Sequence, residues 1–210
     1  MIRRRAEWNL GAFRADAQFR AACAAPARDR ILDAMTKNRR PVLKLGVVDL
    51  GVETASLPNG IEVDLAIVRH PGAAAVVALD REGTVTMLSQ WRHAIGAWMW
   101  EVPAGCRDAG EDALACARRE LGEEAALAAA RWDHLGSIVT IPSFCDERIE
   151  LYLARDLRPG NGVLDHDEVI RVRRVAFDET FSMIARGEIV DAKTIAALYR
   201  ARDFLAIESR

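Results

Sequence analysis

The sequence predicts an α/β fold in which a mixed β-sheet is sandwiched between helices. Three observations support this prediction: segments with strand-like apolar patterns follow one another from Val42, one amphipathic helical pattern interrupts them, and two more helical patterns lie near the end of the chain. Hydrophobic residues make up 50% of the 210 residues and charged residues 29%, which is typical of a globular protein and excludes a largely disordered one.

Residues 1–41 are interpreted as a basic, partly helical extension. The first forty residues carry ten Lys and Arg against four Asp and Glu, a net charge of +6, which leaves −8 for the remainder of a chain whose total is −2. Residues 29–37 have a helical pattern. No nucleic-acid-binding motif accompanies the basic charge, so a solvated surface is the simpler interpretation and no nucleic acid partner is expected.

Strand patterns begin in residues 42–70 and continue beyond them. Residues 61–67 alternate between apolar and polar side chains, which is typical of a half-buried antiparallel strand, whereas residues 73–79 are continuously apolar, as in a central strand. Asn59 and Gly60 predict a tight turn before the first of these. The predicted strands span 42–50, 61–67, 73–79, 84–90, 98–102, 135–141, 149–153 and 169–175. The predicted helices span 112–127, 178–185 and 191–204.

The helix predicted at 112–127 has an apolar face and an acidic face. The apolar face, which should pack against the sheet, consists of Leu114, Ala117, Leu121 and Ala128. The acidic face consists of Glu120, Glu123 and Glu124, at spacings where like charges destabilise a helix. Oxygen ligands of this kind suit Mg²⁺ or Mn²⁺. A solvated acidic surface is the alternative.

The spacing around these glutamates resembles the Nudix box, Gx5Ex7REUxEExGU, in which U is a bulky aliphatic residue. Every specified position matches except one, where Ala126 replaces the family's glycine. A glycine at a helix end usually adopts a left-handed backbone conformation, which costs alanine about 1 kcal/mol. The resemblance therefore implies a Nudix hydrolase with an altered helix end. The matching residues are Gly105, Glu111, Arg119, Glu120, Leu121, Glu123, Glu124 and Leu127.

The segments that flank the box resemble the ADP-ribose pyrophosphatase group of this superfamily. Pro142 lies fifteen residues after Leu127, where that group has a proline, and Ser143 replaces a glycine of the group's loop. GDP-mannose hydrolases share much of this pattern. The matching segments are 57–60, 70–73, 90–93, 101–105, 141–148 and 187–194.

The resemblance implies a metal site and a catalytic base. The metal ligands for Mg²⁺ or Mn²⁺ would be Glu120, Glu123, Glu124 and the carbonyl of Ala104. Arg119 would hold the glutamates, Glu123 would also take part in catalysis, and Glu147 would be the general base on a loop. From the residues alone, an exposed loop carboxylate is the alternative for Glu147.

The resemblance also implies substrate-binding residues ahead of the box. Arg92 would bind the diphosphate, because a planar guanidinium pairs well with phosphate oxygens. Trp98 and Glu101 would contact the substrate beside it. Trp91, Trp98 and Trp100 cluster before the box, and one of them could stack on the base. A surface arginine and a tryptophan used only for packing are the alternatives for Arg92 and Trp98.

The implied reaction is hydrolysis of the diphosphate linkage of ADP-ribose, giving AMP and ribose 5-phosphate. Another nucleoside diphosphate sugar such as GDP-mannose is one alternative, and a non-catalytic module that binds a nucleotide sugar is another. Members of the group are homodimers that exchange N-terminal strands, so residues 42–70 are expected to form the dimer and residues 71–210 the Nudix domain. No apolar run could span a membrane and no CxxC pair occurs, so a cytoplasmic protein with no membrane partner is expected.

Overall fold

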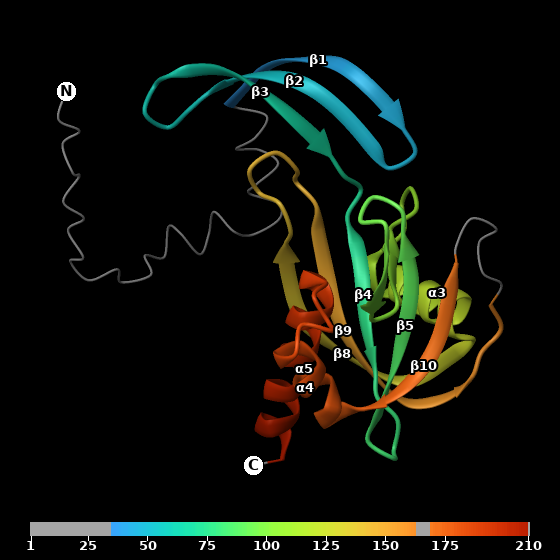
Figure 1. The fold of residues 1–210 in the computed structure, drawn as a ribbon. Coiled ribbons are helices and arrows are strands. Elements are labelled where there is room, and N and C mark those ends of the chain that lie inside the picture. Colours follow the sequence, from blue (N-terminus) through green and yellow to red (C-terminus); the bar gives the residue numbers. More distant parts are fainter. Residues whose placement is uncertain (1–34, 163–168, 210) are drawn as a thin grey trace, which may run out of the picture. The chain divides into compact units, whose positions relative to one another are not determined.

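The computed structural model describes residues 35–162 and 169–209 (Figure 1). Most of the helix predicted at 29–37 lies outside these residues. The strands are β1 (Thr36–Leu45), β2 (Val48–Ser56), β3 (Glu62–Arg69), β4 (Ala73–Ala78), β5 (Thr84–Arg92), β6 (Ala97–Glu101), β7 (Ala104–Cys106), β8 (Leu127–Val139), β9 (Arg148–Pro159) and β10 (Ile170–Ala176). The helices are α3 (Ala113–Ala125), α4 (Phe177–Ala185) and α5 (Ala192–Glu208).

Two compact units divide the chain. Of the described residues, 35–41 and 51–66 belong to one unit, and 42–50, 67–162 and 169–209 belong to the other. All the site residues predicted from the sequence fall in the second unit. The boundaries 1–41, 42–70 and 71–210 stay a prediction.

Strands β1, β2 and β3 form a three-stranded sheet in that order. The single strand predicted at 42–50 is wrong, because Gly46, at φ 54°, turns the chain between β1 and β2. The end of the helix predicted at 29–37 is also wrong, since Thr36 begins β1. The turn at Gly60 is confirmed: its N–H donates to the carbonyl of Leu57 at 2.8 Å, with φ at 80°.

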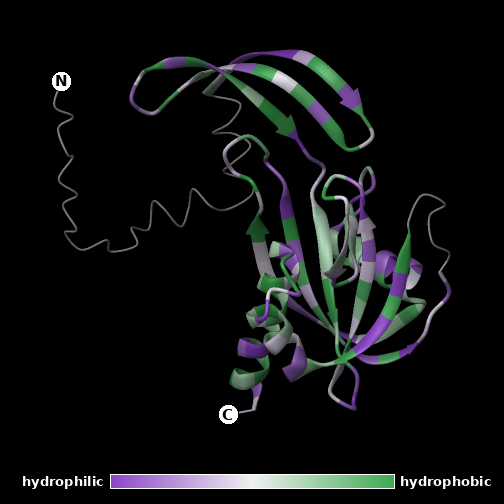
Figure 2. Ribbon diagram, in the orientation of Figure 1, coloured by the Kyte–Doolittle hydropathy of each residue, from purple (hydrophilic) through white to green (hydrophobic). Residues whose placement is uncertain are grey.

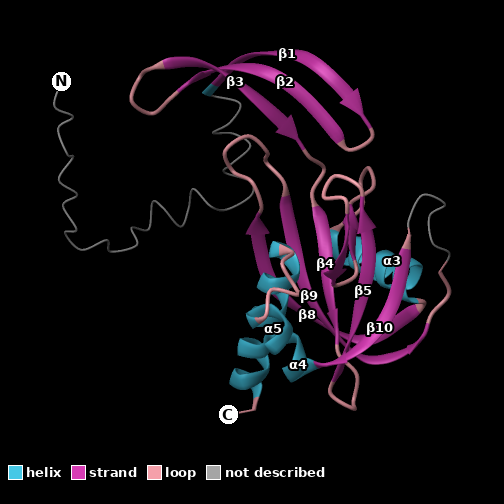
Figure 3. Ribbon diagram, viewed as in Figure 1, coloured by secondary structure: helices cyan, strands magenta, loops and turns pink. Residues whose placement is uncertain are grey.

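The rest of the strands form two sheets, with orders β7-β4-β9-β8 and β10-β5-β6. Figure 3 labels β4, β9 and β8 of the first sheet and β5 and β10 of the second. Strands β4 and β9 are parallel, and the other pairs are antiparallel. The α/β class and the mixed pairing are therefore confirmed, but the strands divide into two sheets where a single sheet was predicted. The sequence periodicity reports which residues face inward and carries no information on which strands pair.

Strand β4 is the centre of this unit and is buried along its whole length. Its continuous apolar sequence, drawn in green in Figure 2, predicts this burial. Ala73, Ala75 and Val77 pack in a core that includes residues of α4 and α5. Alternate residues from the other face of β4 pack in a second core with α3. Because strand side chains alternate between faces, helices cover β4 on both sides.

The helices agree with the sequence patterns to within a few residues. Helix α3 ends earlier than predicted, because Leu127 already begins β8, so Ala128 belongs to a strand and not to the helix face. Strand β8 is consequently much longer than the 135–141 segment that its sequence suggested. Among the described residues, none of the helices has both the length and the apolar character needed to cross a membrane.

Candidate active site

Helix α3 is bounded by local interactions at both ends. The side chain of Asp112 caps its start by accepting the N–H of Ala115 at 2.9 Å. At its end Ala126 adopts the left-handed conformation, with φ 52° and ψ 38°, and its N–H donates to Gly122 at 2.9 Å. The altered helix end expected from the alanine is wrong: the backbone keeps the left-handed conformation that favours glycine, with alanine in it.

Each of the three residues of β7 contacts at least one side chain from α3. The N–H of Ala104 donates to Glu124 Oε2 at 2.8 Å, and the carbonyl of Cys106 accepts from Arg119 Nη2 at 2.9 Å. Between them, the carboxylate of Glu120 lies against Gly105 so closely that a Cβ atom there would be 1.9 Å from Glu120 Oε1. The first glycine of the motif is therefore needed for space.

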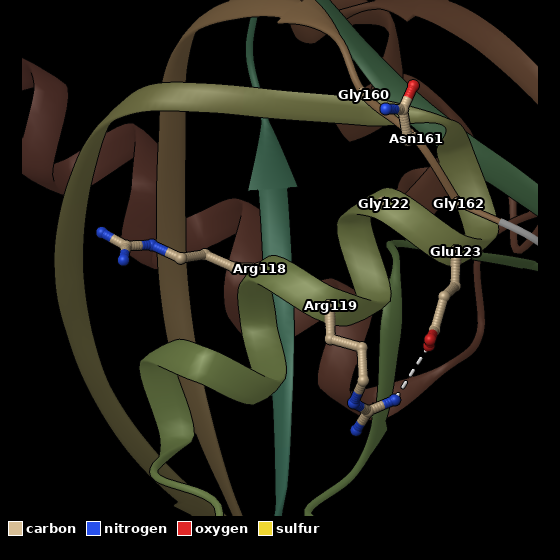
Figure 4. A pocket seen from close by; sticks show the side chains of 7 residues that line it. All are labelled: Arg118, Arg119, Gly122, Glu123, Gly160, Asn161 and Gly162. Atoms are coloured by element: carbon tan, nitrogen blue, oxygen red, sulfur yellow. Dashed lines mark hydrogen bonds and ion pairs between the residues drawn. The ribbon is translucent and has the colours of Figure 1, made fainter.

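Arg119 links the acidic residues of the motif. Its Nε and Nη2 donate to both oxygens of Glu111 at 3.0 Å, while Nη1 donates to Glu120 at 2.7 Å and to Glu123 at 2.9 Å. Figure 4 shows the contact between Arg119 and Glu123. These carboxylates raise the pKa of Arg119, and the hydrogen bonding with Glu111 has the largest effect. The same hydrogen bonding between Arg119 and Glu111 lowers the pKa of Glu111. The prediction that Arg119 holds the glutamates agrees with this geometry.

Glu120 and Glu124 are buried carboxylates, with 7% and 2% of their surface exposed. A solvated acidic surface, the alternative for this helix face, therefore does not describe these two residues; Glu123 is only partly buried. Across residues 35–162 and 169–209, no group of three or more His, Cys, Asp or Glu side chains is already arranged to hold a metal ion. The available donors are nonetheless all oxygen atoms, the kind that hard divalent cations bind.

Arg92 and Glu101 form a bidentate pair, with Nε and Nη2 of the arginine donating to the two carboxylate oxygens at 2.7 Å. Lys193 from the start of α5 donates to the same carboxylate. Burial alone would raise the pKa of Glu101, but Arg92 and Lys193 bring it below its ordinary value. The Glu101 side chain is only 3% exposed whereas that of Arg92 is 39% exposed, so the arginine is the member of the pair that faces solvent.

Glu147 lies on the loop between β8 and β9, where Oε2 accepts the hydroxyl of Thr140 at 2.6 Å. The thiol of Cys106 shows which charges lie around it. Its pKa is raised first by burial and then by the charges of Glu147 and Glu120, with Arg119 and Arg92 opposing them. The charges of Glu147 on the loop, of Glu120 and Arg119 in the box, and of Arg92 therefore all influence the pKa of the Cys106 thiol.

A second feature of α3 is a pocket of about 650 Å³ on its flank (Figure 4). The segment after β9 passes close to the helix here, because a Cβ atom on Gly162 would lie 1.9 Å from the carbonyl oxygen of Gly122. Arg119 and Glu123 line this pocket. Glu123 also belongs to the acidic cluster, which consists of Glu111, Glu120, Glu123 and Glu124, and Arg119 bonds to three of its members. The lining residues are Arg118, Arg119, Gly122, Glu123, Gly160, Asn161 and Gly162.

The NUDIX domain family model matches residues 68–198 of this chain, a span that contains every residue of the acidic cluster. The chain belongs to the Nudix family. The match covers most of the second unit and agrees with the mixed fold around β4.

Individual relatives agree with this membership. The methanol dehydrogenase activator of Bacillus methanolicus is 35% identical over 171 residues, which cover 80% of this chain and 92% of that protein. The ADP-ribose pyrophosphatase of Bacillus subtilis (strain 168) is 34% identical over 169 residues, covering 80% and 91%. The crystal structure of an ADP compounds hydrolase shares the fold, with a TM-score of 0.72 over 83% of this chain and 95% of that one at 19% identity.

Trp98 lies apart from the other predicted residues of the Nudix site. Side chains alternate along β6, so Trp98 and Glu101 point to opposite faces of the strand. The guanidinium of Arg171 lies 4.2 Å from the centre of the Trp98 ring, and Trp91 packs edge-on at 6.0 Å. Stacking of Trp98 on a base stays a prediction, and one face of its ring is covered by Arg171.

Two residues of the Nudix site were not predicted individually. Lys193 holds Glu101, and His70 lies 3.6 Å from Glu147. Both fall in segments that resemble the ADP-ribose pyrophosphatase group, so the sequence marked their positions. Their partners are far away in the sequence, and only the fold brings them together.

Proposed function

We propose that this Nudix protein hydrolyses the diphosphate linkage of ADP-ribose or a related nucleoside diphosphate sugar, with a divalent cation as cofactor. For ADP-ribose, one water molecule is consumed and AMP and ribose 5-phosphate are formed. The observation that carries the proposal is the pair of buried carboxylates, Glu120 and Glu124, which lie over β7 within a Nudix motif that matches at every specified position except Ala126. The 34% identity to an ADP-ribose pyrophosphatase supports the substrate class.

Glu120, Glu124 and the carbonyl of Ala104 would hold the cation, Mg²⁺ or Mn²⁺, with Glu123 contributing to a second position. When bound, such a cation neutralises phosphate charge and lowers the pKa of a bound water. Arg119 already bonds one oxygen of Glu120 and one of Glu123. Its positive charge reduces the mutual repulsion of these carboxylates in the absence of the cation, and Glu111 keeps it in place.

Arg92 would bind the diphosphate. Its guanidinium is partly exposed, and its orientation is fixed by the two bonds to Glu101. Glu101 is buried and bonds to the positively charged side chains of Arg92 and Lys193. In this proposal Glu101 therefore acts on the substrate through Arg92. Lys193 completes the support by connecting Glu101 to the start of α5. A preoriented guanidinium loses little freedom when it binds phosphate oxygens.

Glu147 would act as the general base that takes the proton of the attacking water. A positioned base typically contributes between about 100-fold and 10,000-fold to a rate. Its charge and that of Glu120 both act on the Cys106 thiol, which supports a position beside the proposed cation ligands. Because burial and these two charges raise the pKa of Cys106, the thiol stays protonated and does not compete as a nucleophile.

Formation of AMP from ADP-ribose, or of the nucleoside monophosphate from another nucleotide sugar, tests the proposed function when it is measured with and without a divalent cation. The wild-type protein should hydrolyse ADP-ribose or another member of a panel that includes GDP-mannose, and chelation of the cation should abolish turnover. Glu120→Gln and Glu124→Gln should each lower kcat by at least about 100-fold, the scale expected when a principal charge-stabilising group is removed.

Glu82→Gln is the matched control, because Glu82 is a glutamate with a 78% exposed side chain at a turn remote in sequence from the box. It should retain wild-type kcat. Absence of turnover across the panel, or equal turnover in all three variants, would overturn the proposed function. Binding of a nucleotide sugar without turnover would favour a non-catalytic binding module.

We also propose that the protein is a homodimer formed through residues 42–70. Large apolar side chains are exposed on this part of the chain, and two of them, Ile61 and Leu65, lie in the segment 61–67, whose alternating sequence predicted half-burial. The exposed side chains are Val42, Leu43, Leu45, Val47, Val48, Ile61 and Leu65. Exposed apolar surface of this extent is typical of a protein interface.

A further inference from the structure

His70 is a partly buried histidine between the end of β3 and the start of β4, and its side chain is 9% exposed. Its Nδ1 accepts the backbone N–H of Gly72 at 3.1 Å. Gly72 has a φ of 90°, a conformation that favours glycine and directs this N–H back to the ring. Since Nδ1 is an acceptor, the proton of the neutral imidazole lies on Nε2.

The Nε2 atom of His70 faces the loop carboxylate. It lies 3.6 Å from Glu147 Oε1 and 3.5 Å from the sulfur of Cys106. The other oxygen of Glu147 accepts the hydroxyl of Thr140 at 2.6 Å. The imidazole N–H is thus next to the one oxygen of Glu147 that Thr140 does not hold. Contacts of this length in a free enzyme commonly shorten when substrate binds.

The backbone around His70 is fixed to the same loop. The N–H of His70 donates to Asp146 Oδ1 at 2.8 Å, and Arg69 donates to the other oxygen of Asp146 at 3.1 Å. Two residues earlier, at the end of β3, the N–H of Val68 donates to the carbonyl of Phe144 at 2.8 Å. These bonds connect the segment before β4 to the loop before β9, and so keep the imidazole of His70 close to Glu147.

We infer that His70 is a positioning residue for Glu147, and that it acts through its Nε2–H. This inference rests on the proposed function, in which Glu147 is the general base. With Thr140 on one oxygen and His70 beside the other, the carboxylate is restricted to one orientation. Without the imidazole donor, the carboxylate keeps only the bond to Thr140 and can rotate about it, so fewer molecules have the base correctly placed.

Two substitutions separate the two nitrogen positions of the ring. The amide of glutamine in His70→Gln can place a donor near the position of Nε2, whereas the shorter asparagine in His70→Asn reaches only the position of Nδ1. We expect His70→Asn to lower kcat by about tenfold or more with KM almost unchanged, and His70→Gln to retain kcat to within about threefold. Thermal unfolding measures the folded fraction, so that kcat is expressed per folded protein.

The same substitution in a Glu147→Gln background distinguishes positioning from general structural damage. Glu147→Gln alone should lower kcat by about 100-fold, and adding His70→Asn should lower it no further, because the group that the imidazole positions is already lost. An additional loss of the same size in that background, or equal loss in His70→Gln and His70→Asn, would overturn the inference.

The outcome also distinguishes this inference from the proposed function. If the wild-type protein turns over no nucleotide sugar, the proposed function fails and the role of His70 fails with it. If the wild-type protein is active and Glu147→Gln is impaired, but His70→Asn has normal kcat, the proposed function stands and only the role of His70 is overturned.

Discussion

Gly105 shows at the level of one residue how the Nudix motif combines backbone and side-chain requirements. The carboxylate of Glu120 occupies the space where any other residue would have a Cβ atom. Neighbouring positions of β7 bind Glu124 and Arg119 through backbone atoms, which every residue type supplies. The glycine is therefore the one position of this strand whose identity decides where an acidic side chain lies.

Gly105→Ala should separate activity from stability. The methyl group would force the Glu120 carboxylate to move, and a misplacement of about 1 Å at a reacting centre costs about 100-fold in rate. Stability should change little, because the carboxylate is the end of a flexible side chain that can turn away. Hydrolysis rates and thermal unfolding curves of the variant provide the two measurements.

The matched control for Gly105→Ala is Gly122→Ala in α3. A Cβ atom there would have an ordinary contact of 3.5 Å, and alanine favours a helix. This variant should keep its activity and unfold at a slightly higher temperature. Full activity in Gly105→Ala would mean that Glu120 does not need to lie against β7.

The residues of the Nudix box could be recognised from the sequence alone, because the motif has fixed spacing. The family resemblance also implied that Arg119 holds the glutamates, but nothing in the sequence predicted that Lys193 bonds to Glu101 or that His70 lies beside Glu147. Such contacts depend on side-chain direction and on segments about 75 residues apart, as between His70 and Asp146. The catalytic and binding roles of these residues stay proposals.

At the scale of elements, the end of α3 decides where the next strand starts. Ala126 turns the chain in the left-handed conformation, and β8 begins at the following residue. The helical periodicity of the sequence continues past this point and includes Ala128, which explains why the helix was predicted too long. Apolar periodicity identifies an element but does not detect a single residue that reverses the chain.

Ala126→Gly should stabilise the protein. Glycine adopts the left-handed conformation without the strain that alanine has, and after the greater entropy of the unfolded glycine chain is subtracted, a gain of about 0.5–1 kcal/mol remains. For a chain of this length, that gain corresponds to an increase in Tm of roughly 1–4 °C. Differential scanning calorimetry measures it.

Ala125→Gly, one residue earlier and within α3, provides the opposite result. Glycine in a right-handed helical position costs up to about 1 kcal/mol relative to alanine, so this variant should unfold at a lower temperature. Equal shifts in the two variants would show that backbone conformation at Ala126 does not limit stability.

At the scale of the whole molecule, the proposed dimer accounts for apolar side chains that one chain leaves exposed. Leu45 in β1 is 73% exposed, and Ile207 in α5, far from the proposed interface in sequence, is 71% exposed. Because the two side chains are almost equally exposed, Ile207 provides a matched control for Leu45. A charge at a buried interface position costs far more than one on a free surface.

The wild-type protein should have a mass in solution of twice the 23.2 kDa of one chain. Leu45→Glu should shift it toward the mass of one chain at micromolar concentration, and Ile207→Glu should not. Light scattering coupled to size-exclusion chromatography measures both. A wild-type mass equal to one chain at every concentration would contradict the dimer.

The two-sided burial of β4 has a further consequence for how this molecule can change. Its alternate side chains pack against α3 on one face and against α4 and α5 on the other. A larger side chain on either face would push the strand into the opposite core, and so displace both the helix that carries Glu124 and the helix that carries Lys193. Adaptation to a new nucleotide sugar should therefore arise through the loops around the cleavage chemistry, while the central strand remains small, apolar and resistant to substitution.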